Sequence, residues 1–190
     1  MLEINPMTMS SKSRYLITQA YEFADQYHKG QVRKYTGEPY IYHPLSVARI
    51  LSHYTGDENQ IIAALLHDVV EDTAATFNDV RDNFGTEVYE LVWWLTEDER
   101  GPRSRREHRK HLSIRFADAP AAAKNVKLAD IMDNISSIVE HDPDFYFGTY
   151  RQEIRMLLAR MRYNQQDNTL PNMELFGEVE EQLRLLGDNQ

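Results

Sequence analysis

Residues 61–72 read IIAALLHDVVED, and this stretch decides both the fold class and the place of the candidate site. Its first half is wholly apolar, which predicts a buried helix. His67 and Glu71 are four residues apart, as are Asp68 and Asp72, so a continuous helix would stack the members of each pair. Buried carboxylates need a metal, a cation or a bound proton. The pattern therefore suggests a metal-assisted hydrolase.

The composition is that of an acidic chain that can bury a core. Of its 190 residues, 42% are hydrophobic and 27% are charged. The formal net charge of -9 disfavours non-specific binding to nucleic acid or to an anionic membrane. The chain has no cysteine, which excludes disulfides, thiolate catalysis and cysteine-ligated zinc and is compatible with the cytoplasm. We expect neither a signal peptide nor a membrane span.

Helical periodicity and helix-terminating residues cover most of the chain. The expected helices span approximately residues 11–29, 44–54, 57–72, 76–84, 86–95, 103–115, 120–140 and 148–163, with a last helix after residue 172. No strand alternation and no internal repeat is evident. The sequence thus predicts one all-α domain over residues 11–163, followed by a polar linker and an amphipathic C-terminal helix in residues 164–190.

Four side chains are candidates for one metal site. His67 and Asp68 are adjacent, His43 immediately precedes Pro44 at the expected start of a helix, and Asp130 interrupts an apolar helical stretch. Two imidazoles and two carboxylates suit manganese, iron, nickel or catalytic zinc better than calcium. The metal would lower the pKa of a bound water and direct it at an electrophile.

Two of these residues, His43 and Asp130, also have an ordinary structural explanation when each is taken alone. A lone histidine such as His43 is more often capped or solvated than ligating, and Asp130 could pair with a neighbouring helix. The occurrence of all four candidates together with Glu71 and Asp72 favours the metal site instead.

The ordered motifs resemble the HD phosphohydrolase superfamily and, within it, the hydrolase domain of RelA/SpoT enzymes. The similar segments are residues 30–34 (GQVRK), 37–44 (GEPYIYHP), 64–73 (ALLHDVVEDT) and 126–130 (VKLAD). The resemblance covers roughly residues 13–161, and the length matches the stand-alone small alarmone hydrolases typified by the metazoan SpoT homologue. It implies a single HD-domain helical bundle.

The resemblance also implies a reaction and a set of reacting groups. The reaction would be removal of the 3′-pyrophosphate from a guanosine or adenosine alarmone. One divalent metal ion, usually manganese, would be held by His43, His67, Asp68 and Asp130. Glu71 and Asp72 would orient the attacking water and handle protons. Cationic side chains would stabilise the charge of the pyrophosphate group.

The expected substrate is a small purine nucleotide. By resemblance, Arg33 would pack near the base with Lys34 beside it, and Asn134 would contact the sugar or base. Arg151 and Arg155 lie one turn apart on a late helix and could reach the 5′-phosphates.

Two positions depart from the RelA/SpoT pattern. Where that pattern has a cation directly after the metal aspartate and His or Tyr before the asparagine, this chain has Ile131 and Asp133. A lost cation and a gained acid alter the nucleotide side of the pocket more than the metal side, so adenosine alarmones become realistic substrates.

Two other functions stay open at this point. An HD-type 5′-(deoxy)nucleotide phosphohydrolase would use the same metal ligands. A non-catalytic alarmone-binding module should have lost a ligand or the Glu-Asp pair, and neither has been lost. The apolar stripe of the last helix predicts docking on its own domain, with contact in a homo-oligomer as the second interpretation.

Overall fold

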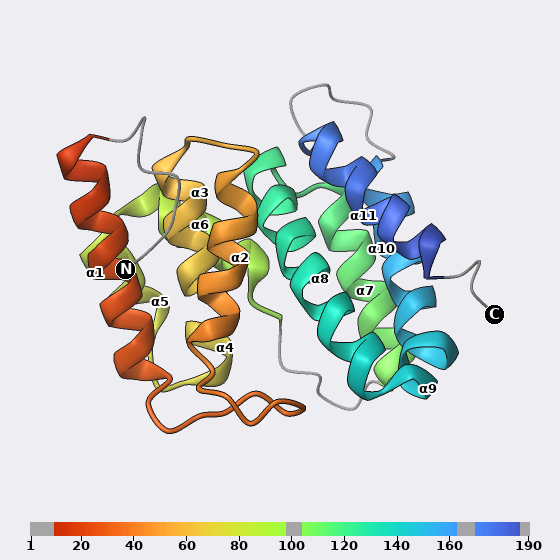
Figure 1. Ribbon diagram of the computed structural model, residues 1–190. Helices are drawn as coiled ribbons and strands as arrows, with labels where there is room; N and C mark the ends of the chain where they lie inside the picture. The colour runs from red at the N-terminus through yellow and green to blue at the C-terminus, as the bar shows by residue number, and fades with distance from the viewer. Residues whose placement is uncertain (1–9, 98–103, 163–169, 187–190) are drawn as a thin grey trace. The chain divides into compact units, whose positions relative to one another are not determined.

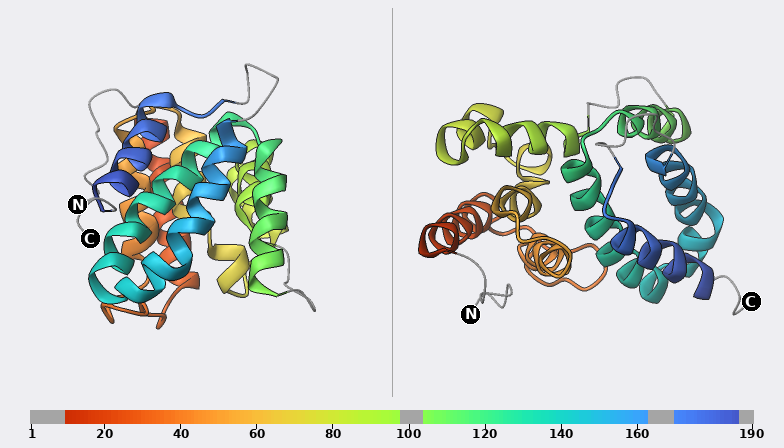
Figure 2. Two further views of the ribbon diagram at one scale, coloured as in Figure 1. Left: turned by 90° about the vertical axis from the view of Figure 1, so that its right-hand side faces the viewer. Right: turned by 90° about the horizontal axis from the view of Figure 1, so that it is seen from above.

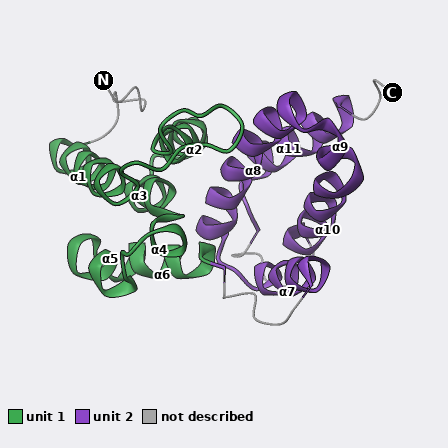
Figure 3. Cartoon of the chain, turned by 90° about the horizontal axis from the view of Figure 1, so that it is seen from below, with its two compact units in different colours: residues 1–96 green, residues 97–190 purple. Residues whose placement is uncertain are grey.

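The computed structural model describes residues 10–97, 104–162 and 170–186. Within these ranges every regular element is helical, and the one strand-like feature is an isolated bridge between Val32 and Pro39 (Figure 1). The predicted all-α class is therefore confirmed. The chain divides into two compact units, residues 1–96 and 97–190 (Figure 3). The domain limits at residues 11–163 and 164–190 stay a prediction.

The helices of the first unit lie close to the expected positions. They are α1 (Ser11–Tyr27), α2 (Tyr42–Ser52), α3 (Glu58–Leu66), α4 (Val69–Asp72), α5 (Phe77–Phe84) and α6 (Thr86–Leu95). The predicted capping box of α5 is present, because the Thr76 side chain accepts from the Asp79 amide and the Asp79 side chain accepts from the Thr76 amide. Gly85, at a φ of 87°, ends this helix.

The core of the first unit is built around α3. Every residue from Ile61 to Leu66 is buried, and α3 packs against α1, α2 and α6. Full burial of a Leu or Ile side chain is worth about 1.5–3 kcal/mol. The side chain of Asp57 caps the helix by accepting from the Asn59 amide at 2.9 Å. The buried residues 61–66 thus anchor His67 and Asp68, which directly follow them.

The prediction of one continuous helix through residues 57–72 is wrong. Helix α3 ends at Leu66, Asp68 has φ -100° and ψ -5°, and α4 begins at Val69. Residues 67 and 68 therefore form a helix break, where polar side chains with low helix propensity are favoured over the helix interior. The amide of Asp72 still donates to the Asp68 carbonyl at 2.9 Å, so the second predicted pair keeps its helical spacing.

The loop between α1 and α2 is as expected, with a tight turn at Gly37. The Arg33 amide donates to the Glu38 carbonyl at 2.8 Å, and the Gly37 amide donates to Arg33 at 3.0 Å. Gly37 has a φ of 70°, which glycine adopts without strain. The loop brings Tyr40 to the start of α2.

The second unit contains the remaining helices. They are α7 (Arg105–Ala117), α8 (Ala121–His141), α9 (Pro143–Phe145), a π-helical turn (Tyr146–Tyr150), α10 (Arg151–Arg162) and α11 (Met173–Leu185). Helix α10 packs along α7, and α11 packs along α8 (Figure 2). Leu175, Val179 and Leu183 are buried, as expected for a helix that docks on its own domain.

Parts of the expected loops fall outside the described ranges. The polar loop predicted at residues 99–104 is described only at Ser104, whose side chain caps α7. Most of the polar linker predicted after residue 163 likewise lies outside them. None of the described helices combines the length and apolarity needed to cross a membrane.

Candidate metal and nucleotide site

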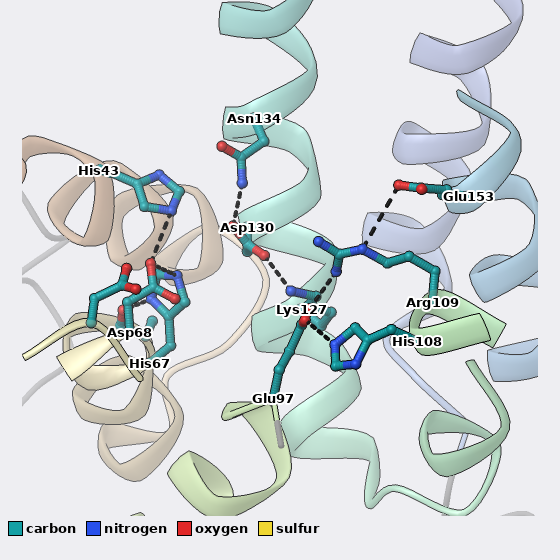
Figure 4. Close-up of polar contacts among 12 residues, drawn as sticks. His43, His67, Asp68, Glu97, His108, Arg109, Lys127, Asp130, Asn134 and Glu153 are labelled. Atoms are coloured by element: carbon teal, nitrogen blue, oxygen red, sulfur yellow. Dashed lines mark hydrogen bonds and ion pairs between the residues drawn. The ribbon is translucent and has the colours of Figure 1, made fainter. Parts of the chain in front are cut away.

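His67 is buried at the end of α3 with a defined tautomer. Its Nδ1 lies 2.8 Å from the carbonyl oxygen of Ala64, which can only accept, so Nδ1 carries the hydrogen. In the neutral ring the lone pair is then on Nε2, the arrangement that a metal-ligating histidine needs. Nε2 lies 3.0 Å from Oδ2 of Asp68 (Figure 4).

His43 approaches the same carboxylate oxygen from α2. Its Nε2 lies 3.6 Å from Asp68 Oδ2, and its ring centroid lies 5.1 Å from that of His67. Both imidazoles are about 3% exposed. Two buried imidazoles that face one carboxylate oxygen require a proton or a cation between them, because lone pairs at this separation repel. The donor set of the first unit therefore fits a divalent metal.

Tyr40 holds the orientation of Asp68. Its hydroxyl donates to Asp68 Oδ2 at 2.6 Å and lies 3.4 Å from Asp72 Oδ2. The tyrosine ring itself packs against His28, with centroids 4.8 Å apart. His28 Nδ1 lies 2.7 Å from Gln31 Oε1, and Gln31 Nε2 donates to the Asp72 carbonyl at 2.7 Å. Residues of the α1–α2 loop thus fix the helix break and α4.

The Glu71–Asp72 pair lies on the exposed side of α4. Partial burial of its carboxyl group raises the pKa of Asp72 above its ordinary value, and the Asp68 carboxylate raises it further. Hydrogen bonding from Tyr40 and the charges of His28 and His67 act in the opposite direction. Solvent reaches the Glu71 and Asp72 side chains, whereas hydrogen bonds with Ala64 and Tyr40 orient the adjacent His67 and Asp68.

Asp130 lies on α8 in the second unit and is 5% exposed. Its two oxygens have separate partners: Lys127 Nζ is 2.8 Å from Oδ2, and Asn134 Nδ2 donates to Oδ1 at 2.6 Å (Figure 4). Lys127 and Asn134 are one turn before and after it, so the helix itself places both groups. The carboxylate is held ionised and in one orientation.

Glu97 anchors a second cluster of charges in the same unit. Its carboxylate is bound to Arg109 and to His108 Nε2, the latter at 2.6 Å. Burial alone would lower the pKa of Lys127, but Asp130 and Glu97 overcome this and raise it above its usual value. Burial would likewise raise the pKa of Glu97, yet Lys127, Arg109 and His108 lower it. A chain of oppositely charged side chains therefore connects Asp130 on α8 with His108 and Arg109 on α7.

The cluster continues from Arg109 to α10. Arg109 Nε lies 3.8 Å from Glu153 Oε2, and Arg105 makes two hydrogen bonds to Glu153, both 2.8 Å long. These contacts bind α7 to α10 through charge-assisted hydrogen bonds.

The remaining predicted residues occupy different positions. Arg33 is half-buried and Lys34 exposed in the α1–α2 loop, where Lys34 Nζ lies 3.1 Å from the Tyr35 hydroxyl. Arg151 and Arg155 line a pocket between α10 and α11. The substrate-binding roles of these residues and of Asn134 stay predictions.

Several residues of the site had no assigned role in the sequence. Gln31 and Tyr40 lie inside the motifs at residues 30–34 and 37–44, and this position was the one indication in the sequence that they belong to the site. Lys127 stands three residues before Asp130, a helical spacing that indicates pairing. Glu97 had no local signal, because its partners His108 and Arg109 lie 11 and 12 residues later in the chain.

Comparison with known proteins identifies the family. The model of the HD domain matches residues 20–154. The chain belongs to the HD-domain family. A guanosine-3′,5′-bis(diphosphate) 3′-pyrophosphohydrolase of Xenopus tropicalis is 42% identical over 142 residues, 70% of this chain and 75% of that protein. The human protein of that name is 40% identical over 140 residues, 72% of this chain and 76% of its own length.

A longer bacterial relative and a solved structure extend this comparison. The Aquifex aeolicus protein of the same name is 40% identical over 146 residues, which cover 76% of this chain but 19% of that protein. The chain therefore spans about a fifth of this relative. A solved metazoan orthologue of SpoT, described as hydrolysing ppGpp, matches with a TM-score of 0.77 and 31% identity, covering 95% of this chain and 98% of that chain. The predicted membership among HD-type hydrolases is confirmed.

Proposed function

We propose that the chain is a metal-dependent alarmone hydrolase that releases pyrophosphate from the 3′ position of a purine nucleotide. One observation carries the proposal: the complete ordered motif set occurs in a chain that matches 75% of the length of the Xenopus 3′-pyrophosphohydrolase. That relative, like the human one, is named for hydrolysis of guanosine-3′,5′-bis(diphosphate).

The proposed metal ligands are His43, His67, Asp68 and Asp130, and the proposed ion is manganese. Support comes from burial of His43, His67 and Asp130, each of which offers a ligand atom. Further support is the tautomer of His67, which leaves Nε2 able to ligate. A divalent ion would lower the pKa of a bound water molecule and would stabilise the negative charge of the phosphates.

Glu71 and Asp72 are the proposed catalytic pair. Asp72 is oriented by its contacts with Tyr40 and, through its backbone, with Gln31. A carboxyl group whose pKa is raised by burial can donate or accept a proton nearer to neutral pH than an ordinary one. Glu71 is exposed on the same short helix, where it can orient a water that enters from solvent.

The proposed substrate contacts come from Arg33, Lys34 and Asn134. Arginine and lysine in the α1–α2 loop supply positive charge for an anionic nucleotide. Ile131 stands where the RelA/SpoT pattern has a cation, and its side chain is buried at 1% exposure, so this position of α8 supplies no positive charge. We include adenosine alarmones among the proposed substrates for this reason.

A competition assay tests the proposal and the base preference together. The protein, loaded with manganese, is given equal amounts of a guanosine and an adenosine 3′-pyrophosphorylated nucleotide, and the products are separated by anion exchange. We expect pyrophosphate and the matching 5′-nucleotide, and no turnover by Asp68→Asn. Survival of both substrates in the presence of bound metal would overturn the proposal.

The departures at Ile131 and Asp133 favour one alternative, an HD-type 5′-nucleotide phosphohydrolase. The same chromatograms separate the two reactions, because this enzyme would release phosphate or triphosphate from the 5′ side. Cytoplasmic location and homo-oligomer formation stay predictions.

A further inference from the structure

Helices α10 and α11 line an open pocket rich in arginine within the second unit. Its volume is about 470 Å³, and its lining includes one carboxylate, that of Glu180. The cationic side chains in the lining are Arg151, Arg155, Arg162 and Arg184. This concentration of guanidinium groups is unexpected in a chain whose formal net charge is -9.

The carboxylates at the pocket leave half of these arginines unneutralised. Glu180 pairs with Arg162 at 3.2 Å, and Glu181 pairs with Arg184 at 2.6 Å. Among the residues that the structure describes, Arg151 and Arg155 have no ion-pair partner; Arg151 Nη2 donates instead to the Leu183 carbonyl at 3.3 Å. Two guanidinium charges therefore remain for a ligand.

Buried polar atoms around Arg151 also lack partners within the described ranges. They are Arg151 Nε and the hydroxyl of Tyr146. Tyr146 is completely buried, and its hydroxyl interacts electrostatically with Arg151 and Arg155. Buried donors and acceptors are normally hydrogen-bonded, so orphaned groups beside a cationic pocket indicate a site for water or ligand oxygens.

The pocket lies on the far side of α10 from the Glu153 cluster. An α-helix turns by about 100° per residue, so Arg151 and Arg155 each lie about 200° around the helix from Glu153. Glu153 faces α7, where it binds Arg105 and Arg109. The pocket arginines therefore face away from the charge cluster that includes Lys127 and Glu97.

The packing of α11 on α8 also shows that the pocket is separate from Asp130. The Asn172 amide, at the start of α11, donates to Asn125 Oδ1 at 2.6 Å, and Gln182 Nε2 donates to Ser136 Oγ at 3.2 Å. Asn125 and Ser136 lie about 140° and 120° around α8 from Asp130. Helix α11 thus covers a face of α8 other than the one that carries Asp130.

We propose that the α10–α11 pocket is an anion site that binds a pyrophosphate group, apart from the site to which Asp130 belongs. Guanidinium groups suit this ligand because they make paired hydrogen bonds to phosphate oxygens. The volume exceeds what a single phosphate fills and admits two phosphate groups. Arg151 and Arg155 bind phosphate here in a second site instead of holding the substrate. This inference does not depend on the proposed function.

Calorimetric titration of the full chain with inorganic pyrophosphate, after removal of divalent metals by EDTA, tests the site without turnover. Arg155→Gln should weaken binding about tenfold, the effect of losing one charge-assisted contact. Arg162→Gln is the second pocket variant and should weaken binding in the same direction. Arg160→Gln is the matched control, because Arg160 is exposed on α10 but does not line the pocket.

Three results would overturn the site: no binding by the wild-type chain, unchanged affinity in both pocket variants, or an equal loss in Arg160→Gln. ADP, titrated in parallel, separates two sources of the pyrophosphate group. Tighter binding of ADP than of pyrophosphate would assign a nucleotide, and equal binding would assign the pyrophosphate group alone. In either case Arg155→Gln must reduce the affinity.

Discussion

Lys127 Nζ lies 2.8 Å from Oδ2 of Asp130, one turn away on the same helix. Their side chains are 16% and 7% exposed, so the pair is largely removed from water. A proposed metal ligand is thus kept ionised and oriented by a cation, and Glu97 helps to stabilise that cation. Lys127 therefore connects a proposed metal ligand to the charge cluster of the second unit.

Replacing Lys127 by Met should destabilise the metal-free protein by about 3 kcal/mol, because it leaves the buried Asp130 carboxylate uncompensated. Urea unfolding at neutral pH measures the loss. Lys110→Met, on the exposed side of α7, is the control and should shift the midpoint little. Equal midpoints for the two variants would mean that the ion pair does not stabilise Asp130.

Tyr40→Phe should weaken metal binding about 10- to 100-fold, as loss of a group that orients a ligand commonly does. The variant removes the hydroxyl that donates to Asp68 at 2.6 Å while keeping the ring that packs on His28. Manganese titration of the metal-free protein by calorimetry measures the affinity. Tyr42→Phe, at an exposed neighbouring position, should bind as the wild type does. Unchanged affinity in Tyr40→Phe would show that Asp68 does not need this donor.

The stability of the protein should fall in acid partly through Glu97. Lys127, Arg109 and His108 hold its pKa below the ordinary value, so the unfolded chain takes up its proton at a higher pH than the folded chain. The contribution is complete above the unfolded pKa and is lost as the pH falls through the folded pKa. In Glu97→Gln, the free energy of unfolding should therefore fall less steeply than in the wild type as the pH is lowered.

Urea midpoints between about pH 7 and about pH 3 provide this comparison. Glu90→Gln, on the exposed side of α6, is the control and should keep the wild-type slope. Identical acid limbs for Glu97→Gln and the wild type would contradict the assignment.

Thr76→Ala should cost about 1 kcal/mol, the usual effect of removing an N-cap. It abolishes the bond from the Asp79 amide to the Thr76 hydroxyl and that from the hydroxyl to Asp79 Oδ2. Asn78→Ala, exposed on the same helix, is the comparison. A loss no larger than that of Asn78→Ala would mean that the capping box adds nothing to the stability of α5.

Local patterns were sufficient to predict most helices and the family. The apolar run at residues 61–66, the capping box at Thr76 and the stripe of α11 are each encoded by residue spacing within a single helix. The break at His67 and Asp68 was not predicted, because their spacing also fits a helix. The π-helical turn at residues 146–150 was missed as well, since one inserted residue leaves no clear change in periodicity.

The supporting contacts of the site were harder to predict than its candidate ligands. Ligand types such as His43 and Asp130 stand out as polar residues in apolar or helix-starting positions. The contact of Tyr40 with Asp68 joins residues 28 apart in the chain, and the Arg105–Glu153 pair joins residues 48 apart. Such contacts follow from packing, which the local sequence does not specify.

The most direct test of the central claim is ³¹P NMR of guanosine-3′,5′-bis(diphosphate) incubated with the manganese-loaded protein. The spectrum should show loss of the 3′ resonances, growth of inorganic pyrophosphate and an intact 5′-diphosphate. Asp68→Asn and EDTA-treated wild type should leave the spectrum unchanged. Inorganic phosphate released from the 5′ side, or no change with the metal-loaded wild type, would contradict 3′-pyrophosphohydrolase activity.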